Sequence, residues 1–331
     1  MSSINDELLT PEKIRKLVSG FQVSRIILTA FELNLFTVLD KKMLTSSDVA
    51  AQANVNATAV ERLMNALVAL GFLKKIHGKF YNSEAASQFL VKGKQEFMGG
   101  LFHQNELWKS WSTLTDAVRK GTSVYEDQDY SDDWTDSFIA AMHYRAVKEA
   151  KILPLMLQLN DVKKMLDVGG GSGAFSMAFI EKNPGIFATI FDLPSVIPIT
   201  QKYIESFTFR NNINYLQGDY LKDDIGTGYD LIFLSAIIHI QGLEENNLLI
   251  RKCIQSLNTG GQIIIKDWVM DETKTNPLGG AVFSINMLVG TNTGDTFTEN
   301  EIESWLNNSG INKIERKDSS YGWSLIIGYK D

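Results

Sequence analysis

A glycine-rich segment is the part of the chain whose residue types and spacing first suggest chemistry. Residues 163–168, Lys-Lys-Met-Leu-Asp-Val, have the character of a short strand, and four of the five residues 169–173 are glycine. A helical pattern begins at Ala174. Glycines at a strand-to-helix turn let the backbone pass close to a ligand, and the helix start offers free N–H groups. The segment predicts a cofactor-binding turn, which by itself fits a dinucleotide equally well.

Two aspartates follow the next two predicted strands. The strand at 187–191 is followed by Asp192, where a carboxylate can accept both hydroxyl hydrogens of a ribose. The strand at 213–217 is followed by Gly218 and Asp219. The carboxyl ends of parallel strands share one edge of a sheet, and open α/β folds bind ligands there. The alternative is that each aspartate only caps the helix that follows it.

His239 could act as a base beside such a site. The strand predicted at 229–234 leads through Ser235 to His239, which places the histidine just beyond the carboxyl end of the strand. Imidazole titrates near neutral pH, so it can remove a proton from a hydroxyl group. A lone histidine after a strand is more often structural, and the neighbouring cofactor turn is what favours the catalytic interpretation.

The elements that must position these residues follow two patterns. Residues 10–95 read as helices and a short hairpin, whereas the chain from about residue 160 onward alternates apolar strands with helices. We expect an α/β protein with an N-terminal domain over 1–100. A helical connection over 101–160 would contribute to the substrate pocket, and a Rossmann-like catalytic domain would cover 161–331.

The N-terminal domain has the pattern of a winged helix. Capping-box patterns at 45–48 and 58–61 each predict the start of a helix. The second helix carries apolar residues on one face and ends at Gly71. Residues 72–81 then predict two short strands around a turn.

Dimerisation rather than DNA recognition is the role we expect for this domain. Reading DNA requires several Arg, Lys, Asn or Gln side chains on the second helix, which offers mainly Arg62 and Asn65. Residues 21–36 are apolar over more than one helical face, so another subunit or the protein's own second domain must cover them. We favour a homodimer in which Ile27 and Leu35 lie at the interface.

Composition argues against several other partners. The formal charge is −7 and no basic stripe is present, which argues against DNA or RNA. No apolar run approaches the roughly 20 residues that span a bilayer, and the first residues do not resemble a signal peptide, so we expect a cytoplasmic protein. Cys253 is the only cysteine and no metal-ligand spacing occurs, so we expect no metal. Six carboxylates between Tyr125 and Asp136 fit no calcium loop and favour a solvated connection.

The chain resembles the class I S-adenosylmethionine-dependent methyltransferases of the small-molecule O-methyltransferase family. This family includes plant caffeate and flavonoid enzymes, hydroxyindole O-methyltransferase and bacterial antibiotic O-methyltransferases. The resemblance covers nearly the whole chain, and its most specific matches are Leu-Asp-Val-Gly-Gly-Gly-Ser-Gly at 166–173, Phe-Asp-Leu-Pro at 191–194 and Gly-Asp-Tyr at 218–220. It implies a homodimer joined through the N-terminal domain, and S-adenosylmethionine used without a metal ion.

The resemblance also implies which residues hold the cofactor. Gly169 and Gly171 would line its methionine part, and Asp192 would bind the ribose. Asp219 and Tyr220 would frame the adenine. The remaining residues that we expect at the cofactor are Leu193, Gly218, Ser235 and Arg145, the last of which could pair with the methionyl carboxylate.

A histidine at the place of His239 is the catalytic base in the family. The implied reaction is removal of a hydroxyl proton as the oxygen attacks the sulfonium methyl group. Asp267 ends the next predicted strand, 261–266, and matches the acidic residue that orients the base. A carboxylate there would fix the tautomer and stabilise the imidazolium, although Asp267 could instead cap a helix.

The sequence departs from the family around this base. Ile and Gln241 follow His239 where the family often has Asp-Trp, and Thr296 beside Asp295 stands in place of a glutamate. We expect an O-methyltransferase for a small, flat aromatic acceptor. The departures leave open C- or N-methylation, or a relative that binds the cofactor without methylating. A DNA-binding regulator and an NAD-dependent oxidoreductase are further alternatives, which the helix and the glycine turn respectively disfavour.

Three groups of residues are candidates for the acceptor pocket. The helix around 134–145 matches the family element that closes over the cofactor. Each candidate could equally belong to the core, since ligand sites and cores share this composition. The candidates are Phe138 and Met142 on that helix, then Phe283, Asn286 and Met287, and finally Leu101, Phe102 and Trp108.

Overall fold

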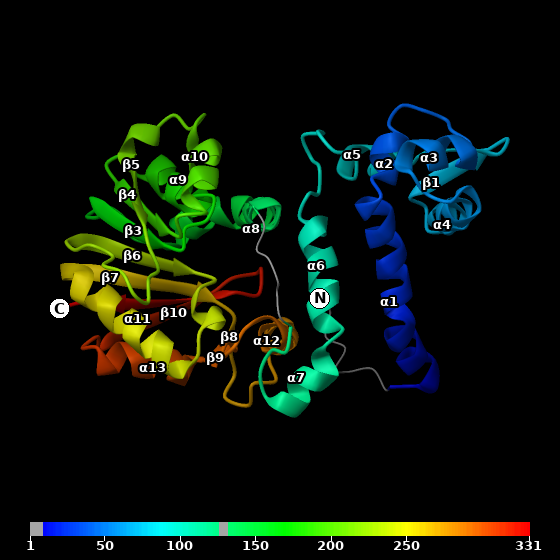
Figure 1. The fold of residues 1–331 in the computed structure, drawn as a ribbon. Coiled ribbons are helices and arrows are strands. Elements are labelled where there is room, and N and C mark those ends of the chain that lie inside the picture. The colour runs from blue at the N-terminus through cyan, green and yellow to red at the C-terminus, as the bar shows by residue number, and fades with distance from the viewer. Residues whose placement is uncertain (1–8, 126–131) are drawn as a thin grey trace. The chain divides into compact units, whose positions relative to one another are not determined.

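The computed structural model of the protein describes residues 9–125 and 132–331. The chain divides into two compact units, one ending at Trp108 and the other running from Lys109 to Asp331. Both units are coloured along the chain in Figure 1.

The N-terminal unit contains the predicted winged helix. Thr45 and Asp48 form both hydrogen bonds of a capping box at the start of α3. The strands β1 and β2 pair in antiparallel fashion around a turn at His77 and Gly78, where both residues have positive φ angles. The elements are α1 (Pro11–Glu32), α2 (Leu35–Val38), α3 (Ser46–Ala53), α4 (Ala57–Ala69), β1 (Leu73–Ile76), β2 (Lys79–Asn82), α5 (Glu84–Phe89) and most of α6 (Leu101–Trp111), whose last three residues belong to the second unit.

The capping box predicted at 58–61 is wrong. Asn56 is the N-cap of α4, and its side chain accepts a hydrogen bond from Ala59 N at 3.0 Å. Glu61 instead forms an ion pair with Lys75 Nζ at 3.0 Å. Asparagine is at least as good an N-cap as threonine, so the helix begins two residues earlier than the pattern indicated.

The apolar segment 21–36 is covered differently from our expectation. Phe31, Leu35 and Phe36 are buried in the core of the N-terminal unit itself. Leu35 therefore does not lie on a surface that a second subunit could cover, and that part of the interface prediction is wrong. Most exposed apolar residues of α1 lie earlier in the helix, at Ile14, Leu17, Val18 and Phe21, and Val23 is exposed as well.

The second unit is built on a seven-stranded sheet with the order β10-β11-β7-β6-β3-β4-β5. Strands β3 to β7 are parallel to one another, and β11 and β10 extend the sheet beyond β7 as antiparallel strands. The strands are β3 (Lys164–Val168), β4 (Phe187–Asp192), β5 (Ile213–Gln217), β6 (Tyr229–Ser235), β7 (Leu257–Asp267), β8 (Val269–Met270), β9 (Phe297–Thr298), β10 (Lys313–Asp318) and β11 (Ser324–Tyr329).

Helices cover both faces of this sheet, as the apolar character of its central strands requires. Figure 1 shows α9 and α10 on one face and α11 and α13 on the other, and each face has its own core. The helices are α7 (Leu114–Lys120), α8 (Asp132–Ala150), α9 (Ala174–Lys182), α10 (Ile197–Ile204), α11 (Leu243–Ser256), α12 (Leu278–Gly290) and α13 (Glu299–Asn308). The predicted fold class, a Rossmann-like α/β domain with an N-terminal winged helix, is confirmed.

The strand registers bring the predicted site residues to one edge of the sheet. Val168 of β3 lies beside Phe191 of β4 and Leu234 of β6. The residues after β3, β4 and β6 therefore emerge together. The strand order also reverses at β3, because β4 and β6 lie on its two sides, and such a switch point forms the binding crevice of open α/β sheets.

Two kinds of feature are absent from residues 9–125 and 132–331. No helix there is both long enough and apolar enough to cross a membrane. No three His, Cys, Asp or Glu side chains of those ranges are grouped as metal ligands would be.

Candidate active site

The glycine turn connects β3 to α9. Gly169, Gly171 and Gly173 have φ angles of 64°, 55° and 74°, a region that glycine adopts at little cost. A Cβ atom at Gly169 would lie 2.3 Å from Ile237 Cδ1, so the Ile237 side chain would have to shift to admit it. α9 begins directly after the turn, at Ala174. The first N–H groups of a helix have no partner within the helix itself.

Three side chains from different elements hold this turn. Asp192 Oδ2 accepts a hydrogen bond from Gly171 N at 2.7 Å, and Thr200 Oγ1 donates to Gly171 O at 2.6 Å. His143 Nδ1, on α8, lies 2.8 Å from Ser172 Oγ. Sequence reasoning missed Thr200 and His143, because neither stands in a pattern that predicts contact with the turn.

Asp192, the last residue of β4, is half-buried and fixed by backbone donors. Its Oδ1 accepts from Leu193 N at 2.8 Å while Oδ2 accepts from Gly171 N. Burial raises the pKa of Asp192, and the two backbone hydrogen bonds oppose this shift. Each carboxylate oxygen can accept a second hydrogen, which leaves capacity for two ribose hydroxyl groups. Val196 is the N-cap of α10, so Asp192 is not a helix cap.

The segment after β5 is held by its own side chains. Asp219 Oδ1 accepts from Leu221 N at 2.9 Å, and Oδ2 forms an ion pair with Lys222 Nζ at 2.8 Å. The hydrogen bond from Lys222 lowers the pKa of Asp219. A Cβ atom at Gly218 would lie 2.8 Å from Phe191 Cζ, so close packing alone explains that glycine.

Tyr220 is joined to the loop that carries His239. Its hydroxyl accepts a hydrogen bond from Gln241 Nε2 at 3.0 Å, and burial raises the pKa of Tyr220. Gln241 is one of the positions where the sequence departs from the family pattern. The departure therefore has a structural partner, which the residue types alone did not indicate.

His239 and Asp267 form a close pair at the ends of β6 and β7. His239 Nδ1 lies 2.8 Å from Asp267 Oδ1 and 2.9 Å from Oδ2, and both side chains are buried. Asp267 Oδ1 also accepts a hydrogen bond from Trp268 N at 2.8 Å. An ionised carboxylate only accepts, so a neutral His239 in this geometry carries its ring proton on Nδ1 and has its lone pair on Nε2.

The turn that carries His239, Ile238–Ile240, is held from two sides. The buried Asn246 Nδ2 donates to Ile238 O at 2.8 Å and to Gln241 O at 3.2 Å. On the other side, a Cβ atom at Gly294 would lie only 2.4 Å from His239 O. The absence of a side chain at Gly294 therefore lets the following loop pack directly on the backbone of His239.

Aromatic residues surround the histidine. Phe283 of α12 meets the His239 ring edge-on, with centroids 4.8 Å apart, and Trp268 lies 6.4 Å from Phe283. On the same helix, Asn286 Oδ1 accepts a hydrogen bond from Trp111 Nε1 at 2.8 Å. Trp111 is a further residue that sequence reasoning missed. Met287, the third candidate on α12, is buried.

The candidates on α8 differ in their surroundings. Phe138 stacks on Trp134 with ring centroids 5.2 Å apart, and it packs against a small cluster that includes Val196. Met142 is half-buried, whereas Arg145 is exposed. Elsewhere at the sheet edge, the cofactor candidate Ser235 is half-buried and Leu193 is exposed.

Leu101, Phe102 and Trp108 belong to the N-terminal unit. Leu101 and Phe102 pack against that unit's core, where Phe102 lies 4.6 Å from Phe31 between ring centroids. Trp108 contacts Phe21, with centroids 6.1 Å apart. Their contact with the acceptor stays a prediction. The carboxylate-rich stretch 125–136 falls mostly outside the described residues.

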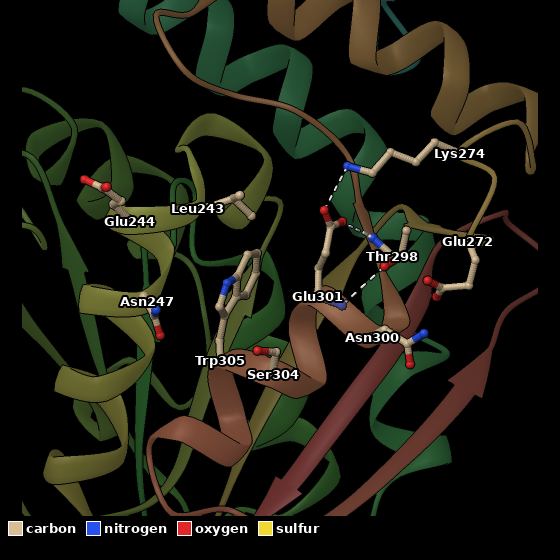
Figure 2. A pocket seen from close by; sticks show the side chains of 10 residues that line it. All are labelled: Leu243, Glu244, Asn247, Glu272, Lys274, Thr298, Asn300, Glu301, Ser304 and Trp305. Carbon is tan, nitrogen blue, oxygen red and sulfur yellow. Dashed lines mark hydrogen bonds and ion pairs between the residues drawn. The ribbon is translucent and has the colours of Figure 1, made fainter.

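A separate surface hollow of about 550 Å³ lies beside α13 (Figure 2). Its Lys274 pairs with Glu301 at 3.1 Å and with Asp295 at 3.3 Å. Glu301 also completes the capping box of α13 with Thr298. Two of the charged residues that line the hollow in Figure 2, Lys274 and Glu301, are thus already paired with each other. No predicted site residue lines this hollow.

A Rossmann-like sheet with a glycine turn after β3 and an acidic residue at the end of β4 fits a class I S-adenosylmethionine-dependent methyltransferase. Family models agree: an O-methyltransferase domain matches residues 111–312, and an O-methyltransferase dimerisation domain matches residues 15–93. The chain belongs to the O-methyltransferase family and is an S-adenosylmethionine-dependent O-methyltransferase of small molecules.

The chain is similar to individual known proteins over nearly its full length. The chain is 27% identical to 3-hydroxy-5-methyl-1-naphthoate 3-O-methyltransferase of Streptomyces sahachiroi, over 92% of this chain and 90% of that protein. It is 28% identical to the tetracenomycin polyketide synthesis 8-O-methyl transferase TcmO of Streptomyces glaucescens, over 97% of both. The structure of human N-acetylserotonin methyltransferase in complex with S-adenosylmethionine has the same fold, with a TM-score of 0.82, 24% identity and 99% of each chain covered.

Proposed function

We propose that the protein methylates a hydroxyl group of a small, flat aromatic molecule, with His239 as the general base. The observation that carries this proposal is the pair of short contacts from His239 Nδ1 to both oxygens of Asp267, at 2.8 and 2.9 Å. They orient the ring and leave Nε2 able to accept a proton.

The residues at the sheet edge fit the cofactor. Gly169 and Gly171 bring bare backbone to the turn, and the half-buried Asp192 keeps acceptor capacity for a ribose. When bound, S-adenosylmethionine supplies a methyl group activated by its sulfonium. We assign the remaining contacts to Asp219 and Tyr220 at the adenine, with Leu193, Gly218, Ser235 and Arg145 nearby.

His239 supplies the proton transfer in this proposal. Its Nε2 accepts the hydroxyl proton of the acceptor as the oxygen gains the methyl group, and Asp267 stabilises the imidazolium that results. Burial of both side chains strengthens this electrostatic stabilisation, because the local dielectric is low. Thr296, which replaces the family's glutamate, leaves Asp267 as the carboxylate in contact with the base.

Aromatic side chains near His239 support an aromatic acceptor. Phe283 contacts the base directly, and Trp268 and Trp111 flank α12. Flat rings pack well in such a setting through offset and edge-to-face contacts. The named relatives include enzymes for a hydroxynaphthoate and for acetylserotonin, which agrees with this class.

A screen of matched acceptors tests the proposal. Hydroxyarenes, aminoarenes and activated carbon nucleophiles of similar size are incubated with the protein and methyl-labelled S-adenosylmethionine, and products are analysed by mass spectrometry. We expect label on oxygen of a hydroxyarene. Label on nitrogen or carbon alone would instead establish an N- or C-methyltransferase, and binding without transfer would indicate a non-methylating relative.

We also propose a homodimer that forms through α1 of the N-terminal unit. Ile14, Leu17, Val18 and Phe21 are exposed and follow the i, i+3, i+4, i+7 spacing of one helical face. An apolar stripe of this kind is typical of a surface that another subunit covers. DNA binding is disfavoured further, since Lys75 engages both Glu61 and Asn65 on the second helix.

A further inference from the structure

The two halves of α8 are attached to the catalytic unit differently. Near its end, Glu149 forms an ion pair with the buried Lys266 at 2.7 Å, and Ala150 belongs to the core under the sheet. Near its start, Ile139 packs against a small separate cluster with Val196 and Ile199. The end of the helix is therefore anchored in the core, and the part from residue 132 to His143, called the first half below, rests on a smaller contact.

The first half of α8 lies over the glycine turn. A Cβ atom placed on Gly171 would be 3.8 Å from Ile139 Cδ1, which is ordinary contact distance. His143, one helical turn further, reaches Ser172 Oγ at 2.8 Å. The helix thus covers the stretch of backbone where the methionine part of the cofactor is expected.

A neighbouring aromatic ring supports the position of His143 in its hydrogen bond with Ser172. The His143 ring lies against Tyr203 of α10, with centroids 4.3 Å apart. Burial lowers the pKa of His143, so the ring is neutral near pH 7 and can bond a hydroxyl group in either tautomer. An ion pair between this half of α8 and α10 joins the exposed Asp136 and Lys202 at 4.0 Å, and such surface pairs contribute little.

We propose that His143 is a positioning residue that fastens the first half of α8 over the glycine turn and thereby slows cofactor release. On this proposal, which rests on the cofactor site proposed above, the cofactor leaves when this half lifts, and lifting breaks the bond to Ser172. The anchored half, through Glu149 and Lys266, stays in place. This role concerns cofactor exchange and depends neither on His239 nor on the acceptor.

The test compares three single variants with the wild-type protein. His143→Ala removes the bond from α8, and Ser172→Ala removes it from the turn. Tyr144→Ala is the matched control, because Tyr144 is the next residue on α8 and is 41% exposed. Alanine favours a helix more than histidine or tyrosine does, so loss of intrinsic helicity cannot explain faster opening.

Two measurements report directly on the lifting of the first half of α8. Amide hydrogen exchange over residues 134–150 and the glycine turn is measured without cofactor. Release of radiolabelled S-adenosylhomocysteine is measured by chase with unlabelled compound. We expect faster exchange and about 2- to 10-fold faster release in His143→Ala and in Ser172→Ala, the range for one lost neutral hydrogen bond. Tyr144→Ala should match the wild type.

A double variant and a conservative replacement of His143 complete the test. The double variant should release S-adenosylhomocysteine no faster than either single variant, because both remove the same bond. His143→Asn, whose amide can bond Ser172 from a similar position, should return release toward the wild-type rate. Unchanged exchange and release in both single variants, or an equal acceleration in Tyr144→Ala, would overturn the proposal. If His143→Ala does not fold, Ser172→Ala decides alone.

Discussion

Asp192 and Asp267 end two strands of one sheet, but their hydrogen bonds suit them to different tasks. Asp192 is fixed by backbone N–H groups of Gly171 and Leu193 and retains acceptor capacity. Asp267 directs both oxygens at His239. We assign the first carboxylate to ligand binding, and the second to orienting the His239 side chain.

The first prediction concerns Asp192. Replacing it with alanine should weaken S-adenosylhomocysteine binding by about 1 to 3 kcal/mol, through loss of charge-assisted hydrogen bonds to the ribose. Isothermal calorimetry measures this directly. Saturable NAD binding by the wild type with no heat from S-adenosylhomocysteine would contradict the cofactor assignment.

The pH dependence of binding provides the control. Burial raises the pKa of Asp192, so its carboxylate takes up a proton at a higher pH than an ordinary aspartate does. Affinity for S-adenosylhomocysteine should therefore fall as the pH is lowered through that raised pKa. Asp192→Asn, which cannot titrate, should bind more weakly and show a flatter pH profile.

At this scale the sequence predicted the residues that stand at strand ends. Asp192 and His239 could be recognised because the strand pattern fixes where each emerges. His143 and Gln241 could not, since their contacts with Ser172 and Tyr220 depend on how helices and loops pack across the sheet edge.

At the scale of elements, apolar patterning predicted four of the parallel strands to within one residue, but the strand predicted at 261–266 was wrong at its start, because β7 begins at Leu257 and its first residues are mostly polar or glycine. The strand predicted at 213–217 has those bounds in the structure, and β3 differs by one residue from 163–168. Helix starts were less certain, because a Ser/Thr-x-x-Glu pattern at 58–61 does not exclude a better cap upstream at Asn56.

The second prediction concerns the loop that supports the catalytic turn. Gly294→Ala places a Cβ atom against the backbone oxygen of His239, so the turn must shift. A displacement of about 1 Å at a reacting group can cost about 100-fold in rate, and we expect a loss of turnover of that order. S-adenosylhomocysteine affinity should change little, because the glycine turn is not displaced.

Gly290→Ala is the matched control. Gly290 ends α12 four residues earlier, and a Cβ atom added there would have nothing within 4 Å of it. Steady-state kinetics on an acceptor from the screen should give near-normal turnover for Gly290→Ala. Normal turnover in Gly294→Ala would show that the loop does not position the base.

At the scale of the whole molecule, the chain combines a catalytic unit with an N-terminal unit whose helix α1 exposes apolar residues. The pattern change along the sequence predicted both units. The sequence could not predict what covers the apolar segment 21–36. An apolar helix has the same sequence pattern whether its own core or a second copy of the chain buries it, as Leu35 demonstrates.

The third prediction tests assembly. Leu17→Glu should convert the dimer to a monomer, since association would bury an unpaired charge at a cost of several kcal/mol. Ser19→Glu, on the opposite side of α1, should leave the dimer intact. Light scattering at micromolar concentration measures both, and a wild-type monomer would contradict the proposed assembly.

The most direct measurement compares cofactor binding and turnover in His239→Ala, with an acceptor identified by the screen. We predict that affinity for S-adenosylhomocysteine stays close to the wild-type value while turnover falls by about 100- to 10,000-fold, the range for general base catalysis. Asp267→Asn should lose less, because an amide can still hold the ring but stabilises the imidazolium poorly. Full turnover in His239→Ala would contradict the account, and would indicate a nitrogen or carbon nucleophile, or a phenol that is already ionised.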